Sequence, residues 1–251
     1  MTDRVSALIV FFILGLIFGS FFNVCIYRIP RGESIVYPPS HCTSCGSKLR
    51  SIDLIPVFSY LLIKGRCRYC RAEVSPRYMF VELVTALIFT AIFLVHGISF
   101  LTMKFLVLAS FMIITGMIDY DTGDVYFKVS LAGMAAGVIF AAAAFYKGEE
   151  AMTYIYGAFL GFGIISVIIL LTKGMGWGDA EICGLGGLFL GIPKTFVMLF
   201  FSFVLGGMAS AILLSTGKKS REESIPFGPF IAAASVIAAL FGDEFINWYW
   251  G

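Results

Sequence analysis

The sequence predicts an all-α membrane protein, a polytopic bundle of about eight transmembrane helices interrupted by one polar insert. Three observations support this fold class. Apolar residues make up 59% of the 251 residues, charged residues only 14%, and the mean hydropathy is +0.92. Apolar runs long enough to cross a bilayer recur along the chain. These runs are continuous and do not alternate with polar residues, which favours helices over a transmembrane β-barrel.

The apolar runs give the expected spans, of which the sixth is short. They begin near Val5, Tyr78, Phe100, Val125, Met152, Gly178, Thr195 and Phe227. The first run continues through Cys25 without an Ala-x-Ala site, so we expect a retained helix and not a cleaved signal peptide. We therefore divide the chain into a first transmembrane helix (1–29), a polar insert (30–77) and a main transmembrane domain (78–251).

The basic residues indicate which side of the membrane the insert occupies. Nine of the eighteen Lys and Arg residues lie between Arg28 and Arg77. Loops rich in Lys and Arg stay in the cytoplasm, and such cations attract the anionic cytoplasmic leaflet. The insert is therefore expected to be cytoplasmic and to lie close to the bilayer. Alternating spans then bring the turns at 119–124, 173–179 and 218–221 to the same side.

The first span carries a packing signal and one polar residue. Gly15 and Gly19 are four residues apart, a spacing that lets helices pack closely. Asn23 follows among apolar residues and needs a hydrogen-bond partner, either on another helix or on a bound polar ligand. We expect the partner to lie on another helix.

Two Cys-x-x-Cys motifs in the insert predict a metal site. They are separated by 21 residues and consist of Cys42, Cys45, Cys67 and Cys70. Each motif offers two thiolates from a tight turn, and two motifs make the closed tetrahedral site of a zinc ribbon with structural Zn²⁺. Two disulfides are the alternative, which the reducing cytoplasm disfavours.

The other features of the insert and the remaining cysteines point to packing. Residues 54–63 are apolar but too short to cross a bilayer, so they are expected to form an interfacial or packing element. Cys25 and Cys183 lie in apolar runs and are expected to be core residues.

A glycine-rich stretch, Lys173-Gly-Met-Gly-Trp-Gly-Asp179, places a carboxylate between two apolar runs. An acid at a membrane boundary is functional by default, and the alternative is a solvated turn between helices. The glycines, including Gly176 and Gly178 next to the acid, allow positive φ and the close approach of another backbone.

A second acidic turn follows the third span. Asp119 comes directly after the apolar residues 113–118, whereas a solvated turn explains Asp121 and Asp124. Positions 119 and 121 are about 200° apart on a helix, so both cannot face one partner. We therefore expect Asp119 to lie in a low-dielectric environment beside Asp179.

Two boundary aspartates on one face of the membrane indicate an aspartyl protease dyad. Like charges held close cannot both ionise easily, so one carboxyl keeps its proton and the other is a carboxylate. The carboxylate can take a proton from water while the acid polarises the scissile carbonyl. The two histidines of the sequence, His41 and His96, do not supply a Ser-His or His-rich metal mechanism.

Six stretches of the sequence carry a family resemblance. They are Gly19-Ser-Phe-Phe-Asn-Val-Cys-Ile-Tyr-Arg-Ile-Pro30, Pro38-Pro-Ser-His-Cys-Thr-Ser-Cys45, Gly65-Arg-Cys-Arg-Tyr-Cys70, Ser75-Pro-Arg-Tyr-Met-Phe-Val-Glu-Leu83, Ile118-Asp119 and Gly176-Trp-Gly-Asp179. With them the chain resembles the type IV prepilin peptidases, the bacterial GxGD aspartyl protease family, over nearly its whole length.

The resemblance implies a function. It implies cleavage of the short basic leader of type IV prepilins or pseudopilins after a glycine, with Asp119 and Asp179 as the catalytic residues. In many members it also implies N-methylation of the new amino terminus with S-adenosylmethionine. The expected location is the bacterial inner membrane, with several spans in the lipid bilayer and an active site that faces the cytoplasm.

The basic leader of such a substrate should be repelled by the basic insert. We therefore expect the leader to dock near acids, and the candidates for substrate binding are Glu82, Asp121, Asp124 and Glu181. Glu82 lies about a turn inside the second span, where it can instead pair with an arginine at the same interface.

Two functions from other classes also fit the sequence. A proton- or cation-coupled transporter could use Asp119 and Asp179 as a relay. A zinc-stapled scaffold for pilus assembly would need neither aspartate. Leader cleavage in detergent, without a membrane potential, distinguishes the enzyme from the relay. We expect no nucleic-acid partner.

Overall fold

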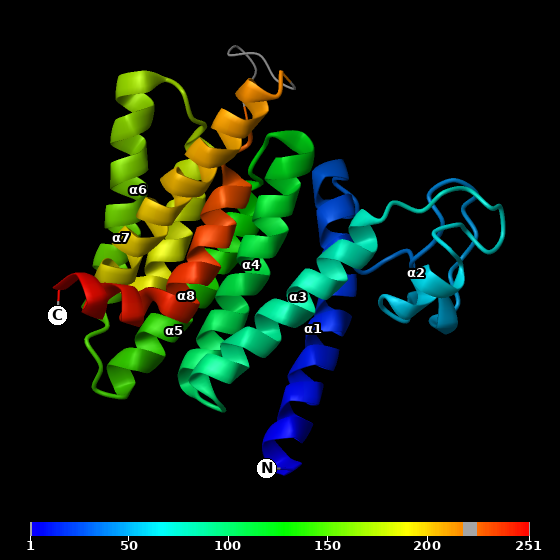
Figure 1. The fold of residues 1–251 in the computed structure, drawn as a ribbon, viewed down its shortest axis with the longest axis horizontal. Coiled ribbons are helices and arrows are strands. Elements are labelled where there is room, and N and C mark those ends of the chain that lie inside the picture. Colours follow the sequence, from blue (N-terminus) through cyan, green and yellow to red (C-terminus); the bar gives the residue numbers. More distant parts are fainter. Residues whose placement is uncertain (1, 218–224, 251) are drawn as a thin grey trace. The chain divides into compact units, whose positions relative to one another are not determined.

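The computed structural model describes residues 2–217 and 225–250, and within them the regular structure is entirely helical (Figure 1). The expected basic turn at 218–221 lies outside the described residues. The chain divides into two compact units, Met1–Gly97 and Ile98–Gly251, called here the N-terminal and C-terminal units. The boundary at residue 97 falls after the second expected span, so the insert and the first two spans belong to one unit.

Two long helices form the frame of the N-terminal unit, α1 (Thr2–Arg28) and α3 (Arg77–His96). They pack closely because α1 presents glycines to α3: a Cβ at Gly15 would collide with the backbone of Ala86, and one at Gly19 would lie 2.7 Å from the Cα of Glu82. Near the other end of the pair, the rings of Phe11 and Phe93 stack with 4.4 Å between centroids. The predicted packing role of the two glycines is confirmed.

The insert contains only short helical segments, and a hydrogen bond joins it to α3. These segments are η1 (Ile29–Arg31), η2 (Ser51–Leu54) and α2 (Phe58–Leu62). The backbone N–H of Val57, which precedes α2, donates to Oε2 of Glu82 at 2.7 Å. Asn23 of α1 donates from Nδ2 to the carbonyl of Tyr78 at 2.9 Å, the helix partner expected for it. Residues 54–63 do not form a span, as predicted, and Phe58, Leu61 and Leu62 of α2 are exposed.

The described part of the C-terminal unit contains five helices. They are α4 (Phe100–Thr122), α5 (Phe127–Tyr146), α6 (Met152–Thr172), α7 (Trp177–Ser215) and α8 (Gly228–Trp250). Across the described residues, seven helices are long and apolar enough to cross a membrane: α1 and α3 to α8. The sixth and seventh expected spans both lie within α7.

Helix α7 is two antiparallel arms joined by a reversal at Gly191. This residue has φ 76° and ψ 172°, which is not helical. Cys183 and Thr195 both contact Gly161 of α6, although a straight helix would hold residues 12 positions apart at a distance of about 18 Å. The two arms, 177–190 and 193–215, therefore correspond to the expected short sixth span and the seventh span.

Side chains satisfy the backbone groups that the reversal frees. The N–H of Ile192 donates to Oγ1 of Thr153 on α6 at 3.3 Å, and Oγ1 of Thr195 donates to the carbonyl of Gly191 at 2.6 Å. Irregular backbone at membrane depth requires such partners, because lipid offers no hydrogen bonds.

A glycine substitution tests the contact between α6 and the first arm of α7. In Gly187→Ala the new Cβ would collide with the carbonyl oxygen of Gly157, and neither backbone can yield without moving its helix. We expect a loss of stability of about 1–3 kcal/mol, seen as a lower thermal midpoint in detergent. The matched control is Gly163→Ala, whose Cβ meets nothing within 4 Å. An equal midpoint for the two variants would contradict this account of the packing.

Candidate active site and metal centre

Two buried carboxyl groups lie at helix ends in the C-terminal unit. Asp119, in the last turn of α4, is 4% exposed, and its Oδ2 accepts a hydrogen bond of 2.8 Å from the N–H of Gly228, the first residue of α8. Asp179, the third residue of α7, is 7% exposed, and its Oδ2 accepts one of 3.1 Å from the N–H of Gly176. Each carboxyl therefore lies at a helix N-terminus, where unpaired N–H groups and the helix dipole favour negative charge.

The structure brings these two acids together. Asp119 and Asp179 are close enough for the charge of one to act on the other. Charges interact more strongly in a buried, low-dielectric environment than in water. The structure therefore places both acids in the same unit with an electrostatic interaction between them, and their role as a catalytic pair stays a prediction.

The glycines around Asp179 act differently from the expectation. Among the described residues, none of Gly174, Gly176 and Gly178 has a positive φ; the left-handed residue of this turn is Lys173, with φ 54°. The expected close approach occurs at Gly178, but it involves a side chain: a Cβ there would lie 2.5 Å from the Cβ of Val125. Glycine is thus required at position 178 because a side chain would collide with Val125, and not because the backbone has a positive φ.

Sequence reasoning missed Gly228. A Cβ at this position would lie 2.6 Å from Oδ2 of Asp119, so only glycine leaves room for the hydrogen bond that its N–H donates. The signal available was the stretch Pro226-Phe-Gly-Pro229 at the start of the last span. Glycine and proline there mark a helix start, but they do not indicate which acid is its partner.

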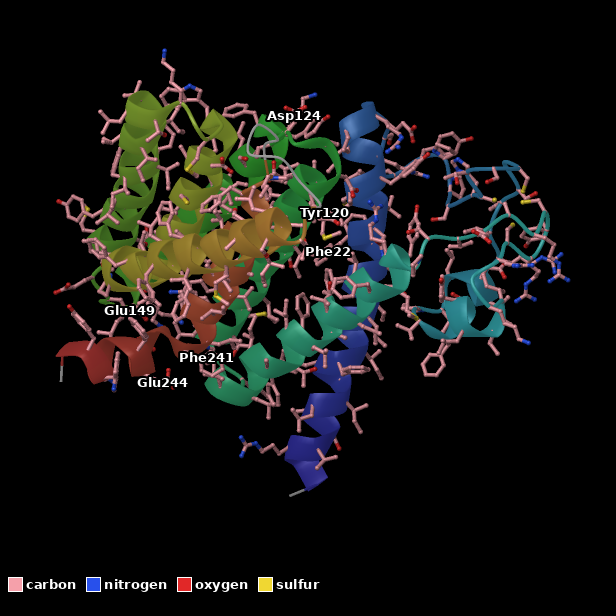
Figure 2. The ribbon with its side chains drawn as sticks, turned by 45° about the horizontal axis from the view of Figure 1, so that its top comes forward. Phe22, Tyr120, Asp124, Glu149, Phe241 and Glu244 are labelled. Atoms are coloured by element: carbon pink, nitrogen blue, oxygen red, sulfur yellow. The ribbon has the colours of Figure 1, made fainter. Side chains whose placement is uncertain are left out.

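The remaining candidate acids lie in different environments. Asp121 and Asp124 are exposed, and Figure 2 shows Asp124 at the surface beyond the end of α4. Glu181 is half-buried, and its Oε2 has no hydrogen-bond partner among the described residues. Glu82 belongs to the N-terminal unit, is 8% exposed and accepts from Val57. Among the candidate acids of the C-terminal unit, Asp119 and Asp179 are the buried ones.

The four cysteines of the insert form one cluster. Their Sγ atoms all lie within 4.8 Å of one another, and those of Cys42 and Cys70 are 3.9 Å apart. A tetrahedral site with metal–sulfur bonds of about 2.3 Å has sulfur–sulfur edges of roughly 3.8 Å. All four are free cysteines, so each offers one sulfur ligand. The donor set fits a metal ion, as the sequence predicted.

The two Cys-x-x-Cys motifs fold into equivalent turns, here called the first knuckle (40–49) and the second knuckle (65–74). In the first, Cys42 donates from its N–H to Ser47 and accepts at its carbonyl from the N–H of Gly46. In the second, Cys67 makes the same bonds to Ala72 and Arg71. Each knuckle also has one isolated antiparallel bridge, so the same turn structure occurs twice in the insert.

Asp53 ties the second knuckle to η2. Its Oδ1 pairs with Nε of Arg68 at 2.9 Å, and its Oδ2 accepts from the hydroxyl of Tyr69 at 3.0 Å and from the N–H of Arg50 at 3.1 Å. Burial alone would raise the pKa of Asp53. The hydrogen bonds from Arg50 and Tyr69 and the charge of Arg68 outweigh burial and hold this pKa below its ordinary value.

A polytopic helical protein that buries two interacting aspartates at helix ends has the architecture of a membrane-embedded aspartyl peptidase. Comparison with known families agrees. Residues 13–96 match the bacterial peptidase A24 N-terminal domain, and residues 106–211 match the type IV leader peptidase family. No solved structure matches the chain.

Relatives match over nearly the full length. The chain is 35% identical over 247 residues to the prepilin leader peptidase/N-methyltransferase of Bacillus subtilis, with 96% of both chains covered. It is 30% identical to that of Pseudomonas putida, covering 92% of this chain and 90% of the relative, and 28% identical to that of Neisseria gonorrhoeae, covering 94% and 92%. The chain belongs to the prepilin leader peptidase/N-methyltransferase family and is a membrane enzyme of this family. The predicted resemblance is confirmed, and the relay and scaffold hypotheses lose their support.

The two knuckles differ at one strained position, which gives a test. The left-handed residue is Gly46 (φ 70°) in the first knuckle and Arg71 (φ 65°) in the second. A side chain in this conformation costs roughly 1–2 kcal/mol, so Arg71→Gly should raise the thermal stability of the insert relative to Arg71→Ala. Both variants lose the same charge, and only the glycine relieves the strain. Equal midpoints for the two would show that the conformation is not strained.

Proposed function

We propose that this chain removes the basic leader from type IV prepilins or pseudopilins, with Asp119 and Asp179 as its catalytic pair. The observation that carries the proposal is the burial of both carboxyl groups in one unit, within range of each other's charge and each with a backbone N–H donor. A solvated turn would not bury them, and a structural pair would not place two like charges together.

The chemistry follows from the shared environment. Two carboxyls held close favour a state in which one is protonated and one is ionised, and they titrate as a unit. The ionised carboxylate takes a proton from water as its oxygen attacks the scissile carbonyl carbon, and the acid donates its proton to the carbonyl oxygen. Collapse of the tetrahedral intermediate then breaks the C–N bond, and the leaving amine takes up a proton. No covalent intermediate with the enzyme is formed.

The active site of this proposal faces the cytoplasm of a bacterial inner membrane. The support is the concentration of nine Lys and Arg residues in the segment 28–77. The leader would dock at the exposed carboxylates of Asp121 and Asp124, with half-buried Glu181 near the catalytic pair as a third acid. Glu82, also predicted for docking, has its carboxylate engaged with the insert, so we propose a positioning role for it.

The cysteine cluster would hold Zn²⁺ in a structural role. Four thiolates close the coordination shell and leave no position for substrate, so the metal would fix the two knuckles against each other and take no part in cleavage. We further propose that the chain methylates the new amino terminus. S-adenosylmethionine would supply the methyl group: the C–S bond would break as the new C–N bond forms, the sulfur would keep the bonding electrons as a neutral thioether, and the amine would lose a proton to solvent.

Replacement of the aspartates tests the cleavage proposal. We expect Asp119→Asn and Asp179→Asn each to abolish leader cleavage, a loss of about 10³-fold or more, with no loss of folding. The double variant should be no worse than either single variant, because the pair acts as a unit. The assay is mass analysis of a prepilin incubated with the enzyme in detergent.

Asp121→Asn is the matched control for this experiment. It removes one carboxylate from the same turn. Because the side chain is exposed and is only one of the proposed docking acids, its loss should weaken the affinity for the leader, while most of the turnover at saturating prepilin should remain. An inactive Asp121→Asn together with an active Asp119→Asn would move the first catalytic aspartate to position 121.

Loss of one cysteine tests the metal proposal. Cys67 is only 4% exposed, and Cys67→Ser should release zinc and lower the thermal midpoint, since metal binding and folding are coupled. Cys25→Ala, which removes a thiol outside the cluster, should leave the zinc content unchanged. Active, reduced wild-type protein that contains no zinc by metal analysis would refute the site.

A further inference from the structure

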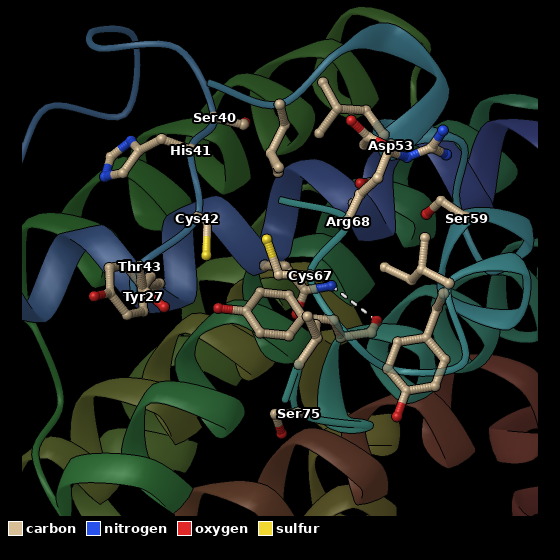
Figure 3. Close-up of a pocket in the computed structure, with 18 of the residues that line it drawn as sticks. Tyr27, Ser40, His41, Cys42, Thr43, Asp53, Ser59, Cys67, Arg68 and Ser75 are labelled. Carbon is tan, nitrogen blue, oxygen red and sulfur yellow. Dashed lines mark hydrogen bonds and ion pairs between the residues drawn. The ribbon is translucent and has the colours of Figure 1, made fainter. Parts of the chain in front are cut away.

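The short helix α2 has two sides with different surroundings. A cavity of about 390 Å³ lies in the N-terminal unit, and Ser59, Tyr60 and Ile63 line it from α2 and its C-terminal cap (Figure 3). At 100° per residue these three positions share one side of the helix. This side of α2 therefore belongs to the interior of the unit.

The opposite side of α2 is apolar and exposed. It consists of Phe58, Leu61 and Leu62, here called the outer face, which are 61%, 58% and 71% exposed. Their spacing of three and four residues brings them together on the helix surface. Ile55, shortly before the helix, is also exposed. Single exposed apolar side chains are ordinary, but a group of them on one face marks an interaction surface.

Contacts within the unit fix the depth of α2 along the two spans, α1 and α3. The N–H of Val57, one residue before α2, donates to Glu82, the sixth residue of α3. Gly19 of α1 also contacts Glu82, since a Cβ there would lie 2.7 Å from its Cα. At 1.5 Å per residue, this level is about 7.5 Å past the start of α3 and about 13.5 Å before the end of α1. The start of α2 is therefore level with the apolar part of both spans.

The sequence next to the outer face is basic. Lys64 and Arg66 follow α2 within four residues, and both are exposed. Segments that lie in a membrane interface combine apolar anchors with Lys and Arg, which attract anionic headgroups. A water-soluble partner would have to reach the outer face at a depth that lipid occupies. Depth and charge together favour lipid as the occupant.

We propose that the outer face of α2 inserts into the acyl chains of an anionic leaflet beside α1 and α3, with Lys64 and Arg66 at the headgroups. The membrane then holds the insert at α2, in addition to the hydrogen bond from Val57 to Glu82. Helix α2 has both roles expected for residues 54–63, packing on one side and interfacial contact on the other. This surface goes beyond the proposed function and does not depend on the cleavage or methylation roles.

Fluorescence quenching by lipid tests the insertion. Leu61→Trp places a reporter on the outer face of full-length, zinc-loaded protein, in nanodiscs of phosphatidylcholine and phosphatidylglycerol that hold one copy each. Wild-type protein gives the background of Trp177, Trp248 and Trp250, which is subtracted. Lipids brominated on their acyl chains should quench most of the added emission. A single copy per disc ensures that no second copy covers the face.

The matched control is Tyr37→Trp, which places the same reporter elsewhere in the insert. Tyr37 is 74% exposed. Arg28, at the end of α1, donates to the carbonyls of Ser34 and Pro38 at 2.9 and 2.7 Å. Residue 37 is therefore level with the end of α1, about 13.5 Å from the level of Gly19, and most of its emission should remain. Zinc content and thermal midpoint establish that both variants are folded.

The outcomes distinguish lipid from other occupants. Strong quenching at position 61 with little at position 37 supports the proposal. An unquenched reporter at position 61 in folded protein, or equal quenching at both positions, overturns it. Loss of the quenching when a prepilin is added would assign the face to an apolar segment of the substrate, which also overturns it.

A second variant tests the headgroup contact. Lys64→Gln together with Arg66→Gln, in the Leu61→Trp protein, should reduce the quenching in discs with phosphatidylglycerol and leave it unchanged in discs of phosphatidylcholine alone. An equal effect in both lipids, or none in either, overturns the assignment of these two cations to anionic headgroups.

Discussion

Burial of two carboxyl groups in the C-terminal unit is the constraint on which much of its structure depends. An ionised carboxylate is costly to remove from water unless it is hydrogen-bonded. The fold meets this cost with helix N-termini, since Gly228 opens α8 against Asp119 and Gly176 caps α7 at Asp179. The N-terminal ends of α7 and α8 must therefore approach the end of α4, and the arrangement of these helices follows from the need to stabilise the acids.

Close approach requires residues without side chains at particular points. Gly228 leaves room for Asp119, and Gly178 leaves room for Val125 of the turn that follows α4. The same requirement holds α1 against α3 through Gly15 and Gly19. In a bilayer, burial of apolar surface gives little driving force for helix association. Small residues therefore stabilise this protein by allowing close packing between helices.

The sequence was sufficient to predict the spans, the cysteine cluster and the burial of Asp119. Each of these follows from a short sequence pattern: a run of apolar residues, a Cys-x-x-Cys motif, or an acid directly after an apolar run. It could not reveal the bond between Asp119 and Gly228, which joins residues 109 positions apart. It also misassigned the positive φ, which belongs to Lys173 and not to the glycines after it. The cavity that Asn23 lines in the N-terminal unit could not be predicted, because residues from α1, both knuckles, η2, α2 and α3 have to come together before its wall exists.

The reversal at Gly191 constrains how the chain can be made. The first arm of α7 runs from Trp177 to Leu190, and its 14 residues extend only about 21 Å, less than the roughly 30 Å of the hydrocarbon core. Because this arm is shorter than the core, we expect it to enter the bilayer together with the second arm, as one hairpin. The partner for Ile192 is Thr153 on the preceding helix. The hydrogen bond that stabilises the reversal can therefore form only after α6 is in place.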